Sequence, residues 1–147
     1  MAGELGAIYF DTSALAKWYL NEESSEAVEA YIQENGPVEI SDLTVIEMRC
    51  LLARRRRERS IGPELEAEAF ATFQDDIRHG ALVCHPFPDG LAAGAVNLMA
   101  VLADVPLRTL DAMHLTIARD VQAGVLATAD HVMMAAGRAL GLSLAEF

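Results

Sequence analysis

Four acidic residues stand at places along the chain where a carboxylate can do chemistry. Asp11 directly follows an apolar run rich in strand-forming residues, and Asp130 follows another after two intervening residues. Glu47 lies in the helix predicted after a second strand. Asp111 is the first residue of another predicted helix, and the strand that leads to Asp130 follows this helix. Clustered carboxylates repel one another unless a cation neutralises them, and Mg²⁺ or Mn²⁺ prefers such oxygen ligands. The four acids therefore predict a metal site, provided that the fold brings them together.

Each acid also has an ordinary structural explanation. Asp11, Asp111 and Asp130 each stand where a helix N-cap is expected, and Thr44-x-x-Glu47 matches the capping-box pattern. Glu47 and Asp111, however, lie in segments otherwise built of apolar residues, where an inward carboxylate is costly unless paired or metal-bound. Capping is the simpler interpretation of any single acid, whereas a metal site is the simpler interpretation of all four acids together.

The order of elements indicates how the acids would be positioned. Strands are predicted over Ala7–Phe10, Val38–Ile40, Ala81–Cys84 and Val125–Ala127, with a fifth over Leu142–Leu144. Helices are predicted over Ala14–Leu20, Ser24–Glu34, Ser41–Arg59, Glu64–Arg78, Leu91–Leu102, Asp111–Gln122 and His131–Leu140. This alternation predicts an α/β fold with a parallel sheet of four to five strands flanked by helices. Ligands bind beyond the carboxyl ends of such strands, where the acids fall.

Composition limits the class of protein. The chain of 147 residues is 52% hydrophobic and 22% charged, which fits one domain over residues 1–147 and excludes a disordered or fibrous protein. The apolar stretch Leu91–Ala103 is too short to span a bilayer, and Met1–Phe10 lacks the positive charge of a signal peptide. Cys50 and Cys84 lie among apolar neighbours and are predicted to be reduced core residues. We expect a cytoplasmic protein without membrane contact.

Four segments resemble the signature blocks of PIN domains, and more closely those of the VapC-type toxins of bacterial toxin–antitoxin pairs. The segments are Tyr9–Leu15, Ser41–Glu47, Leu107–Leu115 and Ala127–Asp130, in the family's order. The resemblance extends from about Ile8 to Leu144. It implies a PIN-like three-layer sandwich, metal-dependent endoribonuclease activity on RNA, and a homodimer blocked by a cognate VapB-like antitoxin.

The resemblance also implies roles for individual residues. The four acids become the catalytic set, with Asp11, Asp111 and Asp130 as ligands of Mg²⁺, or of Mn²⁺, and Glu47 acting through water. Thr128 matches the family's hydroxyl residue, which orients an acid or a water.

Two further groups near the acids remain candidates. Thr12 and Ser13, beside Asp11, are the candidates for orienting that acid, and Ser13 is also a candidate for contacting RNA. His114 and His131 lie close to the acids without metal-ligand spacing, which leaves an auxiliary role open.

Charge argues in two directions. With 11 basic and 22 acidic residues the net charge is 11 − 22 = −11, which by itself argues against a nucleic-acid partner. Five of the 11 basic residues, however, are gathered within Arg54–Arg59. This run is a solvated helix end, a rim that contacts phosphate, or a surface for an acidic partner. Arg54 is seven residues after Glu47, on the same helix face and about 10 Å along the axis, and is the candidate RNA contact.

Two alternatives to a toxin stay open. One is a PIN-domain nuclease that processes RNA without an antitoxin. The other is a non-catalytic PIN-like binding module in which the acids serve only as helix caps. An antitoxin encoded beside the protein would argue against the first alternative. A rise in melting temperature on addition of metal would argue against the second.

Overall fold

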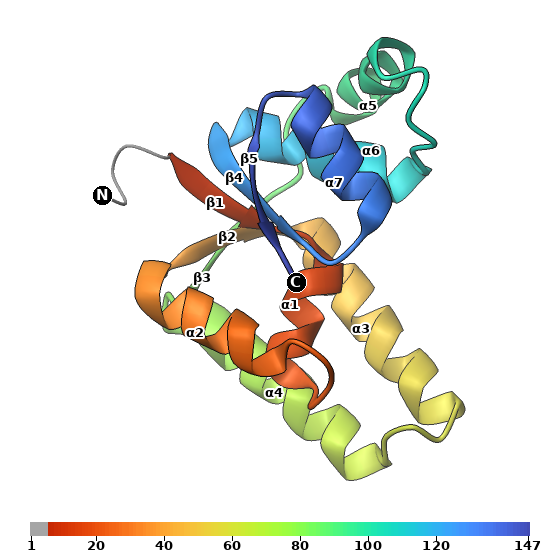
Figure 1. Cartoon of the computed structure of the whole chain (residues 1–147). Coiled ribbons are helices and arrows are strands. Elements are labelled where there is room, and N and C mark those ends of the chain that lie inside the picture. The colour runs from red at the N-terminus through yellow and green to blue at the C-terminus, as the bar shows by residue number, and fades with distance from the viewer. Residues whose placement is uncertain (1–5) are drawn as a thin grey trace.

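The computed structural model describes residues 6–147, and in it strands alternate with helices (Figure 1). The strands are β1 (Ala7–Phe10), β2 (Val38–Ser41), β3 (Leu82–His85), β4 (Ala123–Thr128) and β5 (Ser143–Glu146). The helices are α1 (Thr12–Tyr19), α2 (Ser25–Asn35), α3 (Asp42–Arg57), α4 (Pro63–Arg78), α5 (Leu91–Val101), α6 (Thr109–Asp120) and α7 (His131–Ala139). The expected α/β fold is confirmed, including the fifth strand. The segment Met1–Phe10 is predicted not to be a signal peptide, and its residues 1–5 lie outside the described residues.

The sheet places β1 at its centre. The strand order is β3-β2-β1-β4-β5, and every neighbouring pair is parallel. The chain therefore builds one half of the sheet outward from β1 and then crosses back to build the other half from β4. The strand order reverses between β1 and β4, and ligands of open α/β sheets bind at the carboxyl end of such a reversal.

Two apolar cores cover the two faces of the sheet. Because side chains alternate along a strand, Phe10 and Ala127 face the core formed with α1–α4. Tyr9 and Leu126 face the core formed with α5, α6 and α7. Figure 1 shows these two groups of helices on opposite sides of the sheet, which is the expected three-layer sandwich.

The spacing of Leu43, Ile46, Cys50 and Leu51 in the sequence predicts that these residues share one buried face of α3, and this prediction is wrong in part. Leu43 is buried as expected, but Ile46, on the same predicted face, is 57% exposed. The stripe that faces the core consists of Thr44, Met48 and Leu52, at four-residue steps. Apolar residues occur on two sides of this helix, and their spacing alone does not show which side packs against the sheet.

The prediction that both cysteines are core residues is also wrong. Cys50 is exposed and Cys84 is half-buried, and both are free thiols. Cys50 shares the outward side of α3 with Ile46. Apolar neighbours in the sequence therefore did not indicate burial, because a helix turns successive residues to different sides.

Helix α5 carries no charged residue and leaves apolar side chains exposed. Val96 and Val101 are each 64% exposed and Met99 is 37% exposed, and Leu110 of α6 is 44% exposed. We call the pair Val96 and Met99, which are three residues apart and therefore lie on the same side of the helix, the α5 apolar face. Across residues 6–147, no helix is both long enough and apolar enough to span a bilayer.

Candidate active site

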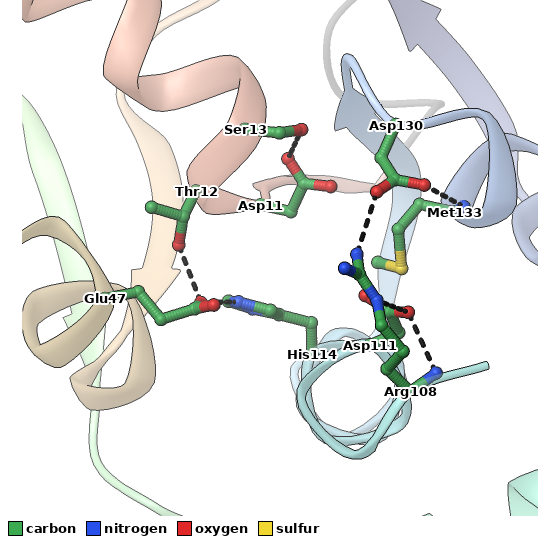
Figure 2. A pocket seen from close by; sticks show the side chains of 9 residues that line it. All are labelled: Asp11, Thr12, Ser13, Glu47, Arg108, Asp111, His114, Asp130 and Met133. Carbon is green, nitrogen blue, oxygen red and sulfur yellow. Dashed lines mark hydrogen bonds and ion pairs between the residues drawn. The ribbon is translucent and has the colours of Figure 1, made fainter. Parts of the chain in front are cut away.

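The four acids predicted from the sequence line one pocket at the carboxyl ends of the strands (Figure 2). Its volume is about 90 Å³. Its lining residues are Asp11, Thr12, Ser13, Glu47, Arg108, Asp111, His114, Asp130 and Met133. Asp11 follows β1 and Asp130 follows β4, so the pocket lies at the reversal of strand order. The fold thus brings together acids from four separate parts of the sequence.

Asp11 is the most enclosed of the acids, with only 4% of its surface exposed. Its Oδ1 accepts hydrogen bonds from Ser13 Oγ at 2.6 Å and from the Ala14 amide at 3.1 Å. Its Oδ2 accepts from Thr128 Oγ1 at 2.5 Å. Burial raises the pKa of Asp11 above its ordinary value, although the hydrogen bonds from Ser13 and Thr128 oppose the rise. A cation nearby would stabilise the charged form of this carboxylate.

The hydroxyls of Thr128 and Ser13 connect the turn after β1 to the turn after β4. Thr128 Oγ1 donates to Asp11 and accepts from the Asp130 amide at 3.0 Å. Ser13 Oγ accepts from the Ala129 amide at 3.0 Å while it donates to Asp11. Both hydroxyls hold Asp11 in place from inside the protein, and an RNA contact by Ser13 stays a prediction.

Glu47 points into the pocket rather than back along its own helix. The Thr44–Glu47 capping box is wrong, because the box at the start of α3 is formed by Ser41 and Thr44. Glu47 Oε1 instead accepts from Thr12 Oγ1 at 2.8 Å and contacts Nε2 of His114. Partial burial raises the pKa of Glu47, but the contacts with His114 and Thr12 outweigh it and lower the pKa below its ordinary value. This acid is therefore held in its charged form.

Arg108, which the sequence analysis did not select, spans two of the acids. Its Nε lies 3.2 Å from Asp111 Oδ2 and its Nη2 lies 3.2 Å from Asp130 Oδ2. Its backbone amide also donates to Asp111 Oδ2 at 3.0 Å. The side chain is 74% exposed, so the guanidinium closes the open side of the pocket. Its position three residues before Asp111, at the N-cap of α6, is the sequence signal that could have identified it.

An aspartate can cap a helix and also line the pocket, as Asp11 and Asp130 do. Asp130 Oδ1 accepts the amides of Val132 and Met133 at 2.8 and 3.2 Å, which caps α7. Its other oxygen, Oδ2, faces Arg108 in the pocket. Asp11 likewise caps α1 through the Ala14 amide. Asp130 thus caps its helix with one oxygen and turns the other to the pocket, whereas both oxygens of Asp11 accept hydrogen bonds from the protein. The predicted N-cap role of Asp111 is wrong, because Arg108 occupies the N-cap of α6.

His114 belongs to the pocket, whereas His131 is exposed and does not line it. The His114 ring is 4% exposed, and its Nδ1 lies 2.8 Å from the Tyr9 hydroxyl. His114 stands one helical turn after Asp111 on α6, which is why both side chains reach the same pocket.

The side chains as they stand are arranged around Arg108 rather than around a metal ion. Within residues 6–147, no three His, Cys, Asp or Glu side chains converge closely enough to hold an ion. Asp111 and Asp130 are turned toward the guanidinium, while Asp11 and Glu47 are turned toward hydroxyl and imidazole donors. Arg108 contributes one positive charge to this cluster of four acids.

The arginine run divides into paired and outward side chains. Arg55 contacts Glu22 at 3.2 Å, and Arg56 contacts Glu66 at 3.0 Å. Arg54 is exposed and does not line the pocket. The run therefore serves partly to join α3 to neighbouring segments, and an RNA contact by Arg54 stays a prediction.

Comparison with known proteins supports the assignment made from the residues. Residues 8–138 match the family model of the PIN domain. Ribonuclease VapC46 of Mycobacterium tuberculosis (strain ATCC 25618 / H37Rv) is 32% identical over 143 residues, which cover 95% of this chain and 97% of that protein.

Two solved structures show the same fold. The sarcin–ricin loop cleaving toxin VapC20 of Mycobacterium tuberculosis superposes with a TM-score of 0.70 and 19% identity, over 89% of this chain and 95% of that chain. The VapBC2 complex of Rickettsia felis, bound to a fragment of promoter DNA, superposes with a TM-score of 0.69 and 14% identity. The match covers 96% of this chain and 98% of that chain.

Proposed function

Because the chain belongs to the PIN-domain family, and within it to the VapC-type ribonucleases, we propose that it is a divalent-metal-dependent endoribonuclease toxin. The observation that carries the proposal is the pocket itself. Asp11, Glu47, Asp111 and Asp130 come from four separate segments and meet where the sheet order reverses. The substrate we propose is RNA, with hydrolysis of internal phosphodiester bonds, and the location we propose for the protein is the cytoplasm.

The donor set fits a hard divalent cation. The four acids offer carboxylate oxygens, the ligand type that Mg²⁺ and Mn²⁺ prefer. Burial raises the pKa of Asp11, and a guanidinium already lies between the other two aspartates, so the pocket favours positive charge. We propose that Asp11, Asp111 and Asp130 hold Mg²⁺, or Mn²⁺, after Arg108 has moved aside.

The protein's own groups would then position the reactants. Mg²⁺, when bound, supplies Lewis-acid activation of the phosphodiester and of the attacking water. Glu47, held in its charged form by His114 and Thr12, orients that water and accepts its proton. Thr128 keeps Asp11 in place through a short hydrogen bond. Arg108, released from the aspartates, is placed to donate to the phosphate of the bound RNA.

Cleavage of single-stranded RNA by the wild type and by Asp111→Asn, each with and without Mg²⁺, tests this proposal. We expect cleavage only by the wild type with Mg²⁺, because the asparagine removes a charged ligand. Equal rates in all four reactions would contradict the proposal.

An antitoxin is the partner that we propose for this chain. The support is the likeness to Ribonuclease VapC46 and to the fold of the VapBC2 complex of Rickettsia felis. Copurification with the product of the adjacent gene would test it. A nuclease that processes RNA without an antitoxin would purify alone and cleave without activation.

We also propose a homodimer, formed through the α5 apolar face. Two copies that each carry a net charge of −11 repel each other over most of their surface. Helix α5 has no charged residue, so it offers a face on which two copies can approach.

One observation favours a second candidate, a binding module without catalysis. Asp11 and Asp130 do cap helices, as that alternative requires. Glu47 caps nothing and is nevertheless held in the pocket by two donors. A module of this kind would show no rise in melting temperature with Mg²⁺ or Mn²⁺.

A further inference from the structure

A row of buried hydrogen bonds leads from the middle of the sheet to the pocket. Ser41 Oγ lies 2.9 Å from the Tyr9 hydroxyl, which lies 2.8 Å from Nδ1 of His114. Nε2 of His114 contacts Oε1 of Glu47 (Figure 2). Tyr9 and Ser41 are fully buried, whereas His114 and Glu47 line the pocket. The four residues come from β1, β2, α6 and α3, so the row exists only in the folded chain.

The chemistry of the groups determines which atom donates at each step. The charged carboxylate of Glu47 only accepts, so Nε2 of His114 must carry a proton. In a neutral imidazole the other ring nitrogen then accepts, and the Tyr9 hydroxyl is its donor. The Tyr9 hydroxyl can donate to Nδ1 and at the same time accept a hydrogen bond from Ser41. Ser41 Oγ accepts from a backbone amide of α3 and can donate its own proton to Tyr9.

Packing alone does not account for a hydroxyl at position 9. Tyr9 lies in a core whose other buried members are apolar side chains, among them Leu115 and Leu126. A hydroxyl in such a place costs free energy unless it is hydrogen-bonded. The two hydrogen bonds that satisfy it are both to members of the row that ends at Glu47.

We propose that Tyr9 and His114 are positioning residues for the pocket. Tyr9 donates to Nδ1 and so reinforces the tautomer in which Nε2 carries the proton, and His114 donates that proton to Glu47. The pair thereby holds Glu47 charged and fixed in direction without touching the substrate. The kinetic part of this inference rests on the proposed ribonuclease function.

Cleavage of an RNA oligonucleotide that the wild type cuts provides the kinetic test. Tyr9→Phe removes one oxygen and should lower kcat by about 10- to 100-fold, as loss of an orienting partner does, with little change in KM. His114→Leu should lower kcat at least as much. His114→Gln should recover part of the loss, because its amide donates to Glu47 and its carbonyl accepts from Tyr9.

A double variant separates positioning from general destabilisation. Because Tyr9 acts only through His114, Tyr9→Phe should cause no further loss of kcat in the His114→Leu background. Additive losses, or full activity of Tyr9→Phe, would overturn the proposal. Tyr31→Phe and His79→Leu are the matched controls, since both lie away from the pocket, and they should keep wild-type kcat.

Nitrogen-15 NMR of the histidine rings tests the same inference without any activity. At a pH where the ring is neutral, we expect the His114 ring to carry its proton at Nε2 in the wild type and to show both tautomers in Tyr9→Phe. A neutral ring protonated at Nδ1 in the wild type would overturn the proposal. If the wild type cleaves no RNA, the ribonuclease function fails, while the spectra still decide whether Tyr9 sets the tautomer.

Discussion

Arg108 reaches across the pocket to Asp130, and its Nη2 lies 3.2 Å from Oδ2 of that carboxylate. The two residues are 22 positions apart and belong to the starts of different helices. Through its Nε the same guanidinium also contacts Asp111. Two of the three aspartates proposed to hold a cation therefore share one guanidinium of the protein itself, and a metal ion must compete with this side chain.

This competition predicts that Arg108→Ala binds metal more tightly than the wild type. The half-saturating Mn²⁺ concentration, measured by thermal shift, should fall by a few-fold, since exposed ion pairs are weak competitors. Arg119→Ala, which removes an exposed arginine from the same helix, is the control and should match the wild type. Weaker Mn²⁺ binding by Arg108→Ala would show that the guanidinium does not compete with the ion.

The buried position of Asp11 predicts that metal stabilises the protein through this residue. Mg²⁺ or Mn²⁺ should raise the melting temperature of the wild type, because a ligand that binds only the folded state stabilises it. Asp11→Asn should abolish the rise, whereas Glu29→Gln, an exposed change on α2, should preserve it. An unchanged rise in Asp11→Asn would remove Asp11 from the ligand set.

The exposed α5 apolar face predicts a self-association that one charge disrupts. Light scattering should give twice the chain mass for the wild type and the single-chain mass for Val96→Glu, because the new carboxylates would be buried against each other. Leu65→Glu places a charge at a 41% exposed leucine of α4 and should remain dimeric. A wild type that is monomeric at all concentrations would contradict this interface.

The outward position of Arg54 predicts a contribution to RNA affinity through phosphate. Arg54→Gln, assayed in the Asp111→Asn background to prevent cleavage, should weaken binding of single-stranded RNA and reduce the salt slope by about 0.7. Arg119→Gln, on α6, is the control. An unchanged salt slope would assign Arg54 to the solvated helix end or to a partner protein.

Tyr19 predicts how stability changes at high pH. Burial and the hydrogen bond to Asp76, 2.7 Å long, raise the pKa of Tyr19 in the folded protein. The unfolded chain then releases this proton first, at about pH 10, so the stability from Tyr19 is complete below that pH and lost above it. Urea unfolding should show the free energy of unfolding falling more steeply above pH 10 in the wild type than in Tyr19→Phe, by up to about 1.4 kcal/mol per pH unit. Equal slopes in the wild type and in Tyr19→Phe would contradict the raised pKa of Tyr19.

Local sequence signals were sufficient for the elements and for the acids. Alternating apolar runs and helical segments predicted the parallel sheet, since periodicity and turn residues act over a few neighbouring positions. Asp11 and Asp130 could be placed at the carboxyl edge because each follows a strand directly or within a few residues. The same local signals did not show which side of α3 packs, and so Ile46 and Cys50 were wrongly expected inside.

The sequence by itself thus determined a parallel α/β chain with four acids at its strand ends. Only the tertiary structure decided what surrounds each acid. Tyr9 meets His114 across 105 positions, His114 meets Glu47 across 67, and Thr128 meets Asp11 across 117. Contacts between such distant residues depend on strand order and on which face of each helix packs, and neither leaves a repeating pattern in the local sequence. For that reason the acids could be predicted from the sequence, while Arg108 and the row from Tyr9 to Glu47 became visible only in the folded chain.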